Sequence, residues 1–386
     1  MAAEEIVILG AARTAMGAFL GGFARETAPE LGASAIRAAL AQAGAAPERV
    51  DEAVMGCVLP AGLGQAPARQ AAIRAGLPAA TPCATLNKVC GSGMKAAMIA
   101  HDAIRAGSAR VVVAGGMESM TNAPHLLEKA RIGHRPGEVL VRDHMFVDGL
   151  EDAYDKGRSM GSFAEDCAER YQFTREAQDA YAIGSVERAR AAAASGAFAA
   201  ELAVHAGLRL DEQPQRASPE KIPTLRPVFR DGGTVTAGNA SPISDGAAAL
   251  VLADRAEAER LGTAPLARIL GHASHAQEPG WFTTAPIFAI RKLQDRLGWS
   301  GGEVDLYEIN EAFAVVAMAA MRDLDISRDR INVNGGACAL GHPIGCSGAR
   351  IVVTLVHALR ARGLRRGIAA ICIGGGEATA MAVEIV

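Results

Sequence analysis

The chain has 386 residues, half of them apolar and 21% charged, and its formal net charge is −3. The length allows two or three domains, and the composition is that of an ordinary globular protein with a buried core. A near-neutral charge gives no long-range attraction to nucleic acid or to an anionic membrane. It therefore excludes the strongly basic proteins that bind those partners.

The two ends of the chain and its cysteines help to predict where in the cell the protein is located. The start, Met1-Ala-Ala-Glu-Glu, has no basic stretch followed by a long apolar run, and the final Glu-Ile-Val is not a peroxisomal signal. The most apolar predicted helix, 312–321, is too short to span a bilayer. Seven cysteines, an odd number, without a secretion signal predict reduced thiols rather than a disulfide framework. We therefore expect a cytoplasmic protein.

The chain repeats one pattern of elements in the same order. A strand-like run at 6–12 has a counterpart at 267–273. A helix opened by Gly91-Ser-Gly and followed by an apolar strand has a counterpart opened by Cys346-Ser-Gly. Short β-rich runs that alternate with longer amphipathic stretches predict α/β layers. A repeat this long indicates a duplicated domain, so we predict two similar α/β halves related by a pseudo-twofold axis.

Between the halves lies a region of different composition, richer in charged, His, Met and turn residues. It contains a predicted helix with Thr174 as its N-cap, and then a glycine-rich stretch, 232–241. An insertion of this size on a rigid scaffold is a usual place for substrate recognition. The predicted division is a first half at 1–118 plus 244–265, a loop domain at 119–243 and a second half at 266–386.

Cys90 is the first candidate for chemistry. It lies in Asn87-Lys-Val-Cys-Gly-Ser-Gly, where glycines precede a helix-periodic run. A cysteine at such a strand-turn-helix junction faces free backbone amides and the positive end of the helix dipole, and both favour the thiolate. The same amides can hold an oxyanion. The alternative is a small buried cysteine on a tight turn.

His342 stands in a segment with many glycines, 332–348, which implies close backbone approach and little local freedom. An imidazole fixed on such a loop suits a base that deprotonates a thiol. Cys338, His342 and Cys346 also have ligand-like spacing. A zinc site normally needs four ligands, however, and no second ligand pair stands nearby, so we predict no metal there.

Two strand ends supply further candidates. Cys372 ends an apolar strand just before Gly374-Gly-Gly, which makes it a candidate acid/base thiol, although a buried strand cysteine is normally inert packing. These glycines do not form a dinucleotide site, because only ten residues follow them. Asn310 ends the strand 304–309, where it can hold a water or a carbonyl, or cap the next helix.

Together these segments resemble the thiolase family over essentially the whole chain. Several long motifs in the same order are a far more specific signal than any one of them. The resemblance implies an α/β fold of the thiolase type, a duplicated five-layer αβαβα core with an inserted loop domain. The matching segments are 87–95, 114–120, 232–249, 310–314, 332–350 and 372–376.

The resemblance also implies a role for each candidate. Cys90 is similar to the acylated nucleophile, His342 to its activating base, and Cys372 to the thiol that moves the α-proton. Asn310 is similar to the residue that orients a water which, with His342, binds the thioester oxygen. The amides of Cys90 and Gly374 would form the second oxyanion hole. The CoA and substrate contacts implied by position are Met160, Phe229, Ala240, Ser241 and Phe282.

The implied activity is acyl transfer between CoA thioesters. It comprises reversible Claisen condensation of acetyl-CoA with an acetyl- or acyl-CoA, and thiolysis of 3-oxoacyl-CoA, through an acyl-Cys90 intermediate with ping-pong kinetics. The implied enzyme is an acetyl-CoA C-acetyltransferase of fatty-acid metabolism. CoA is its substrate, no cofactor is expected, and the loop region 121–148 would support a homotetramer, with a dimer as the alternative.

Three other functions are weighed against this one. The first is a broader 3-ketoacyl-CoA thiolase of β-oxidation, and the second is a non-catalytic acyl-CoA or lipid carrier on the same scaffold, which would be expected to lose a reactive residue. A ketoacyl-synthase-like condensing enzyme would need a second His where Cys372 stands.

Three positions depart from the family pattern. Ser159 stands where many short-chain members have His, and Phe282-Thr-Thr replaces a smaller segment. Both are expected near the acyl pocket, so the sequence leaves the chain-length preference open. Glu377 replaces a Met or Gln, and the sequence assigns it no role.

Overall fold

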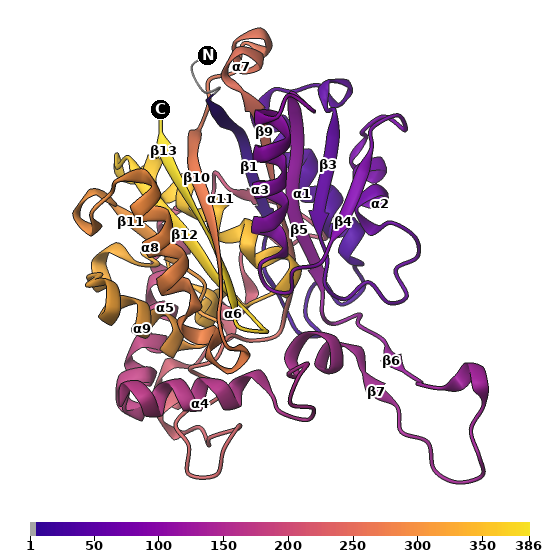
Figure 1. Cartoon of the computed structure of the whole chain (residues 1–386), viewed down its shortest axis with the longest axis vertical. Coiled ribbons are helices and arrows are strands. Elements are labelled where there is room, and N and C mark those ends of the chain that lie inside the picture. The colour runs from indigo at the N-terminus through magenta and orange to yellow at the C-terminus, as the bar shows by residue number, and fades with distance from the viewer. Residues whose placement is uncertain (1–4) are drawn as a thin grey trace.

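The computed structural model describes residues 5–386. Met1–Glu4, on which the prediction about the chain's start partly rests, lie outside the described residues. The remaining chain forms layers of helix and sheet, with the first half and the second half side by side (Figure 1).

The first sheet collects strands from the first half and from the segment that returns to it: β1 (Ile6–Thr14), β2 (Gly17–Ala18), β3 (Glu52–Gly56), β4 (Cys83–Leu86), β5 (Val111–Ser119), β8 (Leu202–Ala203) and β9 (Ser244–Asp254). Its main order is β1-β9-β5-β3-β4. Strand β9 is antiparallel to β1 and β5, whereas β3 is parallel to β5 and β4. The central strands are buried on both faces, which explains their near-continuous runs of Val, Ile, Leu and Ala.

The second sheet repeats this order with strands from the end of the chain: β10 (Ala267–Ala276), β11 (Leu306–Ile309), β12 (Arg366–Ile373) and β13 (Glu377–Ile385). Its order, β10-β13-β12-β11, has the same sequence of antiparallel and parallel neighbours as the first. Both leading strands carry a bulge at the same point, between Ile8 and Gly10 and between Ile269 and Gly271. The two halves therefore share strand order and a β-bulge, as the predicted duplication requires.

Helices cover both sheets and fill the space between them. The outer face of the first sheet packs against α1 (Ala28–Ala43) and α2 (Pro67–Ala75), and that of the second against α8 (Ala285–Leu297). Between the sheets lie α3 (Ser92–Arg105) and α11 (Ile344–Arg362), which contact each other. The sheets meet edge to edge where β1 pairs with β10. This αβαβα arrangement confirms the predicted fold class; the domain bounds stay a prediction.

Apart from the 21-residue helix α5 (Arg175–Ser195), the inserted region holds short elements, at one end of the molecule (Figure 1). An arm that contains the small strands β6 (His125–Leu126) and β7 (Arg142–Asp143) projects away from the body. As predicted, Thr174 caps a helix, because its hydroxyl accepts a hydrogen bond from the Ala177 amide. The remaining helices are α4 (Met160–Tyr171), α6 (Glu212–Arg216), α7 (Arg255–Leu261), α9 (Ala314–Leu324) and α10 (Ala337–Leu340).

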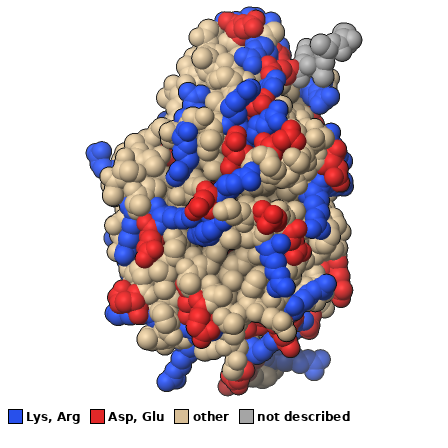
Figure 2. Space-filling model, turned by 90° about the vertical axis from the view of Figure 1, so that its left-hand side faces the viewer, with Lys and Arg blue, Asp and Glu red and all other residues tan. Residues whose placement is uncertain are grey.

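One helix of the described chain, α11, is long and apolar enough to cross a membrane. Of its most apolar window, 89% is buried inside the protein, as in the core helix of a globular domain. The most apolar helix predicted from the sequence, 312–321, is α9 in the structure (Ala314–Leu324), whose 11 residues are too few to span a bilayer, as predicted. On the face seen in Figure 2, acidic and basic side chains are interspersed, in keeping with the near-neutral net charge.

The contact between α3 and α11 depends on glycine. A Cβ at Gly93 would lie 2.7 Å from the Ala349 nitrogen, so we expect Gly93→Ala to force the two helices apart. Overpacking of this kind costs about 1–3 kcal/mol of the free energy of unfolding, which urea denaturation would measure. Gly184→Ala on α5, where a Cβ would lie 3.9 Å from the Arg328 guanidinium at ordinary contact distance, is the matched control and should be neutral or stabilise by at most about 1 kcal/mol. Equal effects of the two substitutions would contradict the close-contact argument.

Candidate active site

Cys90 lies in the tight turn between β4 and α3. Its neighbour Val89 has φ of +47°, a left-handed conformation that a β-branched residue rarely adopts. Ser92 holds the turn, because its hydroxyl accepts from the Lys88 amide at 2.8 Å and donates to the Val89 carbonyl at 2.6 Å. Backbone strain maintained in this way is often found at functional sites.

His342 lies in the turn before α11, and its hydrogen bonds fix its tautomer. Its Nδ1 is 2.5 Å from the hydroxyl of Ser347, which donates its one proton to the Pro343 carbonyl at 3.0 Å. Nδ1 therefore carries the ring hydrogen and donates it to Ser347, an assignment made from the hydrogen-bond network. Burial and the positive charge of Arg350 lower the pKa of His342 to about 3. The imidazole is thus neutral, with Nε2 free to accept a proton.

The Cys90 sulfur is protonated in the free protein. Burial raises the pKa of Cys90 to about 11, although the backbone amides of Gly374 and of Cys90 itself act in the opposite direction by donating to the sulfur. The predicted effect of the backbone amides is thus present, since they lower the pKa of Cys90, but desolvation outweighs them and the net pKa is raised. A base must remove the proton before Cys90 can attack a substrate, and His342 lines the same cavity.

Cys372 lies at the end of β12, fully buried. Burial and the neighbouring Cys90 sulfur raise the pKa of Cys372 well above the usual range for a thiol. The chain then turns sharply, with φ of +92° at Gly375 and +85° at Gly376. This turn presents the Gly374 amide to the Cys90 sulfur, so two backbone amides point to the place where an oxyanion on an acyl-cysteine would form.

Asn310 lies directly after β11, behind His342. Its Nδ2 is 3.5 Å from His342 Nε2, at the outer limit for a hydrogen bond. Its Oδ1 is buried and has no hydrogen-bond partner within residues 5–386. A buried oxygen of this kind is expected to bind a water or a ligand. The geometry thus suits the water-orienting role, which stays a prediction.

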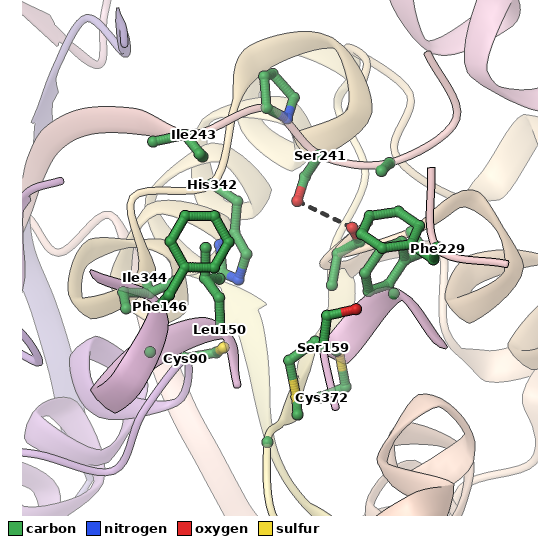
Figure 3. Close-up of a pocket in the computed structure, with 18 of the residues that line it drawn as sticks. Cys90, Phe146, Leu150, Ser159, Phe229, Ser241, Ile243, His342, Ile344 and Cys372 are labelled. Atoms are coloured by element: carbon green, nitrogen blue, oxygen red, sulfur yellow. Dashed lines mark hydrogen bonds between the residues drawn. The ribbon is translucent and has the colours of Figure 1, made fainter. Parts of the chain in front are cut away.

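These groups share one cavity of about 390 Å³ (Figure 3). The cavity is lined by side chains and backbone from parts of the chain that are far apart in the sequence: Cys90, His342, Cys372 and Gly374. All five predicted substrate contacts line it too: Met160, Phe229, Ala240, Ser241 and Phe282. Of the predicted site residues, only Asn310 does not line the cavity; it contacts His342 from behind.

Ser159 and Phe229 of the inserted region lie in a wall on the side of the cavity away from His342, whereas Phe146 and Leu150 of the same region are seen on the His342 side (Figure 3). Ser241 donates to the Ala312 carbonyl at 2.9 Å, and Phe229 packs edge-on against Phe313 with ring centroids 5.9 Å apart. Gly161, in the first turn of α4, leaves the room that the Phe229 ring needs, because a Cβ there would lie 2.3 Å from it. The wall is therefore anchored to the second half of the chain.

Sequence analysis assigned no role to several apolar residues that line the cavity, and no motif marks Phe146 or Leu150. Phe146 and Leu150 belong to a short π-helix, Phe146–Leu150, whose pattern is neither helical nor strand-like in the sequence. Sequence analysis assigned no role to Ser347 either, although its position on the first turn of α11 after His342 is a usable signal. The other lining residues of this group are Met120, Ile243 and Ile344.

Cys338 and Cys346 do not join His342 in a ligand set. The Cys338 sulfur lies 3.7 Å from the carbonyl oxygens of Asn239 and of Glu311, and His342 uses Nδ1 for Ser347. The ligand-like spacing therefore does not bring three ligand atoms together.

Glu377, which had no assigned role, forms an ion pair with Lys88. Lys88 is two residues before Cys90, and Glu377 follows the glycine turn that contains Gly374. The pair therefore joins the two turns that carry the predicted oxyanion amides. Its side chains are partly exposed, 24% for Lys88 and 36% for Glu377.

Comparison with known proteins identifies the family. Residues 6–256 match the model of the thiolase N-terminal domain, and residues 263–385 match that of the thiolase C-terminal domain. The chain belongs to the thiolase family. The resemblance inferred from the sequence motifs is thus confirmed, and this thiolase is an acyltransferase.

Relatives cover this thiolase from end to end. It is 51% identical to acetyl-CoA acetyltransferase 2 of Arabidopsis thaliana, over 99% of this chain and 97% of the relative. It is 48% identical to an acetyl-CoA acetyltransferase of Cupriavidus necator, over 98% and 99%. The crystal structure of the Acat5 thiolase from Ascaris suum in complex with coenzyme A superposes with a TM-score of 0.95 at 42% identity, covering 99% of this chain and all of that one.

The raised pKa of Cys90 predicts slow alkylation near neutral pH. Iodoacetamide reacts with the thiolate, so its rate at Cys90 should rise about tenfold per pH unit from pH 7 to pH 9. Mass spectrometry of the peptide that contains Cys90 would follow the reaction, with Cys90→Ser to confirm the site. A rate that levels off below pH 8 would show a low-pKa thiolate and contradict this account.

The Lys88–Glu377 pair predicts a small, salt-dependent effect on catalysis. A partly exposed ion pair contributes about 0–1 kcal/mol, so Glu377→Gln should lower kcat/KM by at most about fivefold at low salt. High salt should narrow the gap between wild type and variant. Glu303→Gln breaks a comparably exposed pair with Arg366 far from the cavity and should leave kcat/KM unchanged. If the difference in kcat/KM between wild type and Glu377→Gln persisted at high salt, the charge attraction between Lys88 and Glu377 would not be its cause.

Proposed function

We propose that this thiolase is an acetyl-CoA C-acetyltransferase that condenses two acetyl groups and cleaves acetoacetyl-CoA through an acetyl-Cys90 intermediate. The observation that carries the proposal is the convergence of Cys90, His342 and Cys372 on one apolar cavity. The curated relatives named above, which are acetyl-CoA acetyltransferases, support the choice of acetyl-CoA.

In the first half-reaction, His342 Nε2 accepts the Cys90 proton and the sulfur attacks the thioester carbonyl. The amides of Cys90 and Gly374 donate to the oxyanion that forms, and such a donor is typically worth about 3 kcal/mol. The carbon–sulfur bond to CoA then breaks, and the leaving thiolate takes a proton from Cys372, which is left as a thiolate, while His342 Nε2 keeps the proton from Cys90. The products are acetyl-Cys90 and free CoA, and the reaction is ping-pong.

In the second half-reaction, Cys372 removes a proton from the α-carbon of the second acetyl-CoA, which becomes an enolate. The α-hydrogen of a thioester is a weak acid, so its partner needs a high pKa, and burial gives Cys372 such a pKa. Asn310, through a water at its unpaired Oδ1, together with His342 would hold the enolate oxygen. Attack of the enolate carbon on acetyl-Cys90 forms the carbon–carbon bond and frees the Cys90 sulfur as a thiolate, which takes back the proton held on His342 Nε2.

Coenzyme A is a substrate in this proposal, and no cofactor takes part. The Ascaris suum neighbour, solved with coenzyme A, supports a CoA thioester site. The wall from the inserted region would hold the CoA chain through Met160, Phe229, Ala240, Ser241 and Phe282. We also place the enzyme in the cytoplasm and in fatty-acid metabolism.

A homotetramer is the proposed assembly, with the projecting arm as its contact. Two apolar side chains on the arm are largely exposed, Ile132 at 83% and Leu140 at 77%. Exposed apolar side chains on a projecting arm favour burial against other subunits. The double variant Ile132→Asp, Leu140→Asp should therefore reduce the mass measured by light scattering, whereas Val386→Asp, at an exposed apolar site off the arm, should not. An unchanged tetramer mass in the arm variant would sink the assignment of this contact.

Substrate preference is tested by CoA-dependent thiolysis of acetoacetyl-CoA and of a medium-chain 3-oxoacyl-CoA. We expect cleavage of the short substrate, with loss to background in Cys90→Ala and full activity in Cys83→Ala, a half-exposed cysteine outside the cavity. Comparable cleavage of the longer substrate would instead favour a 3-ketoacyl-CoA thiolase, in which the small Ser159 side chain widens the pocket. No cleavage of either by folded protein would favour the acyl-CoA carrier.

A further inference from the structure

A cluster of two histidines and one aspartate lies outside the active site. Within residues 5–386 it is the only group of three or more His, Cys, Asp or Glu side chains whose ligand atoms all lie within 4.8 Å of one another. His101 and Asp102 belong to α3 and His272 to β10. The cluster therefore joins the purple first half to the orange second half of Figure 1.

Both imidazole rings are directed at the same carboxylate oxygen. His101 Nδ1 lies 3.0 Å from Asp102 Oδ1, and His272 Nε2 lies 2.9 Å from that same oxygen. The rings meet edge to face with their centroids 5.0 Å apart. Two ring nitrogens and one carboxylate oxygen thus converge in the way that ligands converge on a single ion.

The three side chains differ in solvent exposure, from the buried His101 to the exposed Asp102. The His101 side chain is 6% exposed, that of His272 is 16% exposed and that of Asp102 is 59% exposed. An ion can therefore enter from the Asp102 side and keep a water as its fourth ligand. Three protein ligands and one open position are a common tetrahedral arrangement around Zn²⁺.

We propose that His101, Asp102 and His272 form a binding site for a divalent transition-metal ion, with Zn²⁺ as the ion that fits best. Two imidazoles and one carboxylate suit zinc, whereas Mg²⁺ and Ca²⁺ favour oxygen ligands throughout. On binding, the hydrogen on each ring nitrogen that faces Asp102 moves, by exchange with solvent, to the other nitrogen of the same ring, so that each imidazole stays neutral and its freed lone pair coordinates the ion.

The role of the ion is structural. His101 lies about 14 Å along α3 from its first residue, well away from Cys90 at the start of the helix. The ion would tie α3 to β10, so binding should stabilise the packing of the two halves. Arg105, one turn after His101, is close enough for its positive charge to act on that ring, so we expect micromolar rather than tighter affinity. Sequence spacing pointed to no metal here, because His272 follows Asp102 by 170 residues.

The experiment uses the full-length protein without a purification tag, freed of metal by chelator and then titrated with Zn²⁺ and, separately, with Co²⁺. We expect one ion per chain, and visible Co²⁺ bands without the near-ultraviolet charge-transfer band that cysteine ligands produce. His272→Gln should weaken binding at least tenfold. His275→Gln is the matched control on the same strand, since His275 bonds to Gln277 and stacks on Phe288 outside the cluster.

Thermal unfolding supplies a second readout. Zn²⁺ that binds only the folded protein should raise the Tm of the wild type and of His275→Gln, and leave that of His272→Gln unchanged. Thiolysis activity without added metal shows that each variant is folded, because neither histidine lines the cavity. Equal Zn²⁺ affinity in His272→Gln, a cysteine charge-transfer band with Co²⁺, or no binding by the wild type would each overturn the proposal.

Discussion

The close contact of α3 with α11 is the constraint on which the site depends. Both helices begin directly after a turn that carries a reactive side chain, Cys90 before one and His342 before the other. Their first turns can meet only because glycines leave no side chain between them. A Cβ at Gly93 would lie 2.7 Å from a backbone nitrogen of α11, and one at Gly348 would lie 2.6 Å from the Met94 nitrogen. The catalytic distance is thus set by backbone contact, which is stiffer than any side-chain packing.

Two buried carboxylates then hold the turns themselves. Glu118, at the end of β5, accepts from the amides of Val58, Leu59 and Gly345, and so ties the loop after β3 to the first turn of α11. Its burial raises its pKa to about 7. The folded state therefore keeps this proton where the unfolded chain would lose it, and the stability from that difference is lost as the pH rises from about 4.5 through 7.

Glu311 does the same for the segment before His342. It accepts from the Tyr181 and Ser185 hydroxyls of α5, from the Asn332 side chain and from the Cys338 amide. The inserted region, through α5, thereby supports the catalytic loop as well as forming the wall of the cavity. The region predicted to recognise the substrate is in this way coupled to the position of the predicted base.

The repeat predicted two α/β halves, and the glycine-rich motifs singled out three side chains that the structure brings to one cavity, because both patterns can be read locally. The five-layer order and the role of each side chain came from the resemblance to the family, and the roles stay predictions. Features that arise from long-range contact were out of reach. The Lys88–Glu377 pair spans 289 positions, and the π-helix at Phe146–Leu150 has no periodic signature. The raised pKa of Cys90 was out of reach for a related reason: the amides and the helix dipole that favour the thiolate can be read from the sequence, but the burial that outweighs them cannot.

The effect of burial on the pKa values of Cys90 and His342 determines how the site works. With the pKa of Cys90 raised to about 11 and that of His342 lowered to about 3, the two groups rest as a neutral thiol and a neutral imidazole. Proton transfer between them creates two charges in a buried cavity, which is unfavourable until a thioester carbonyl is in place to take up the negative charge. The amides of Cys90 and Gly374 meet that charge on the substrate oxygen. A neutral thiol also resists oxidation, since the thiolate is the reactive form. The burial that raises the barrier in the empty site therefore protects the nucleophile and confines its reactivity to the bound thioester.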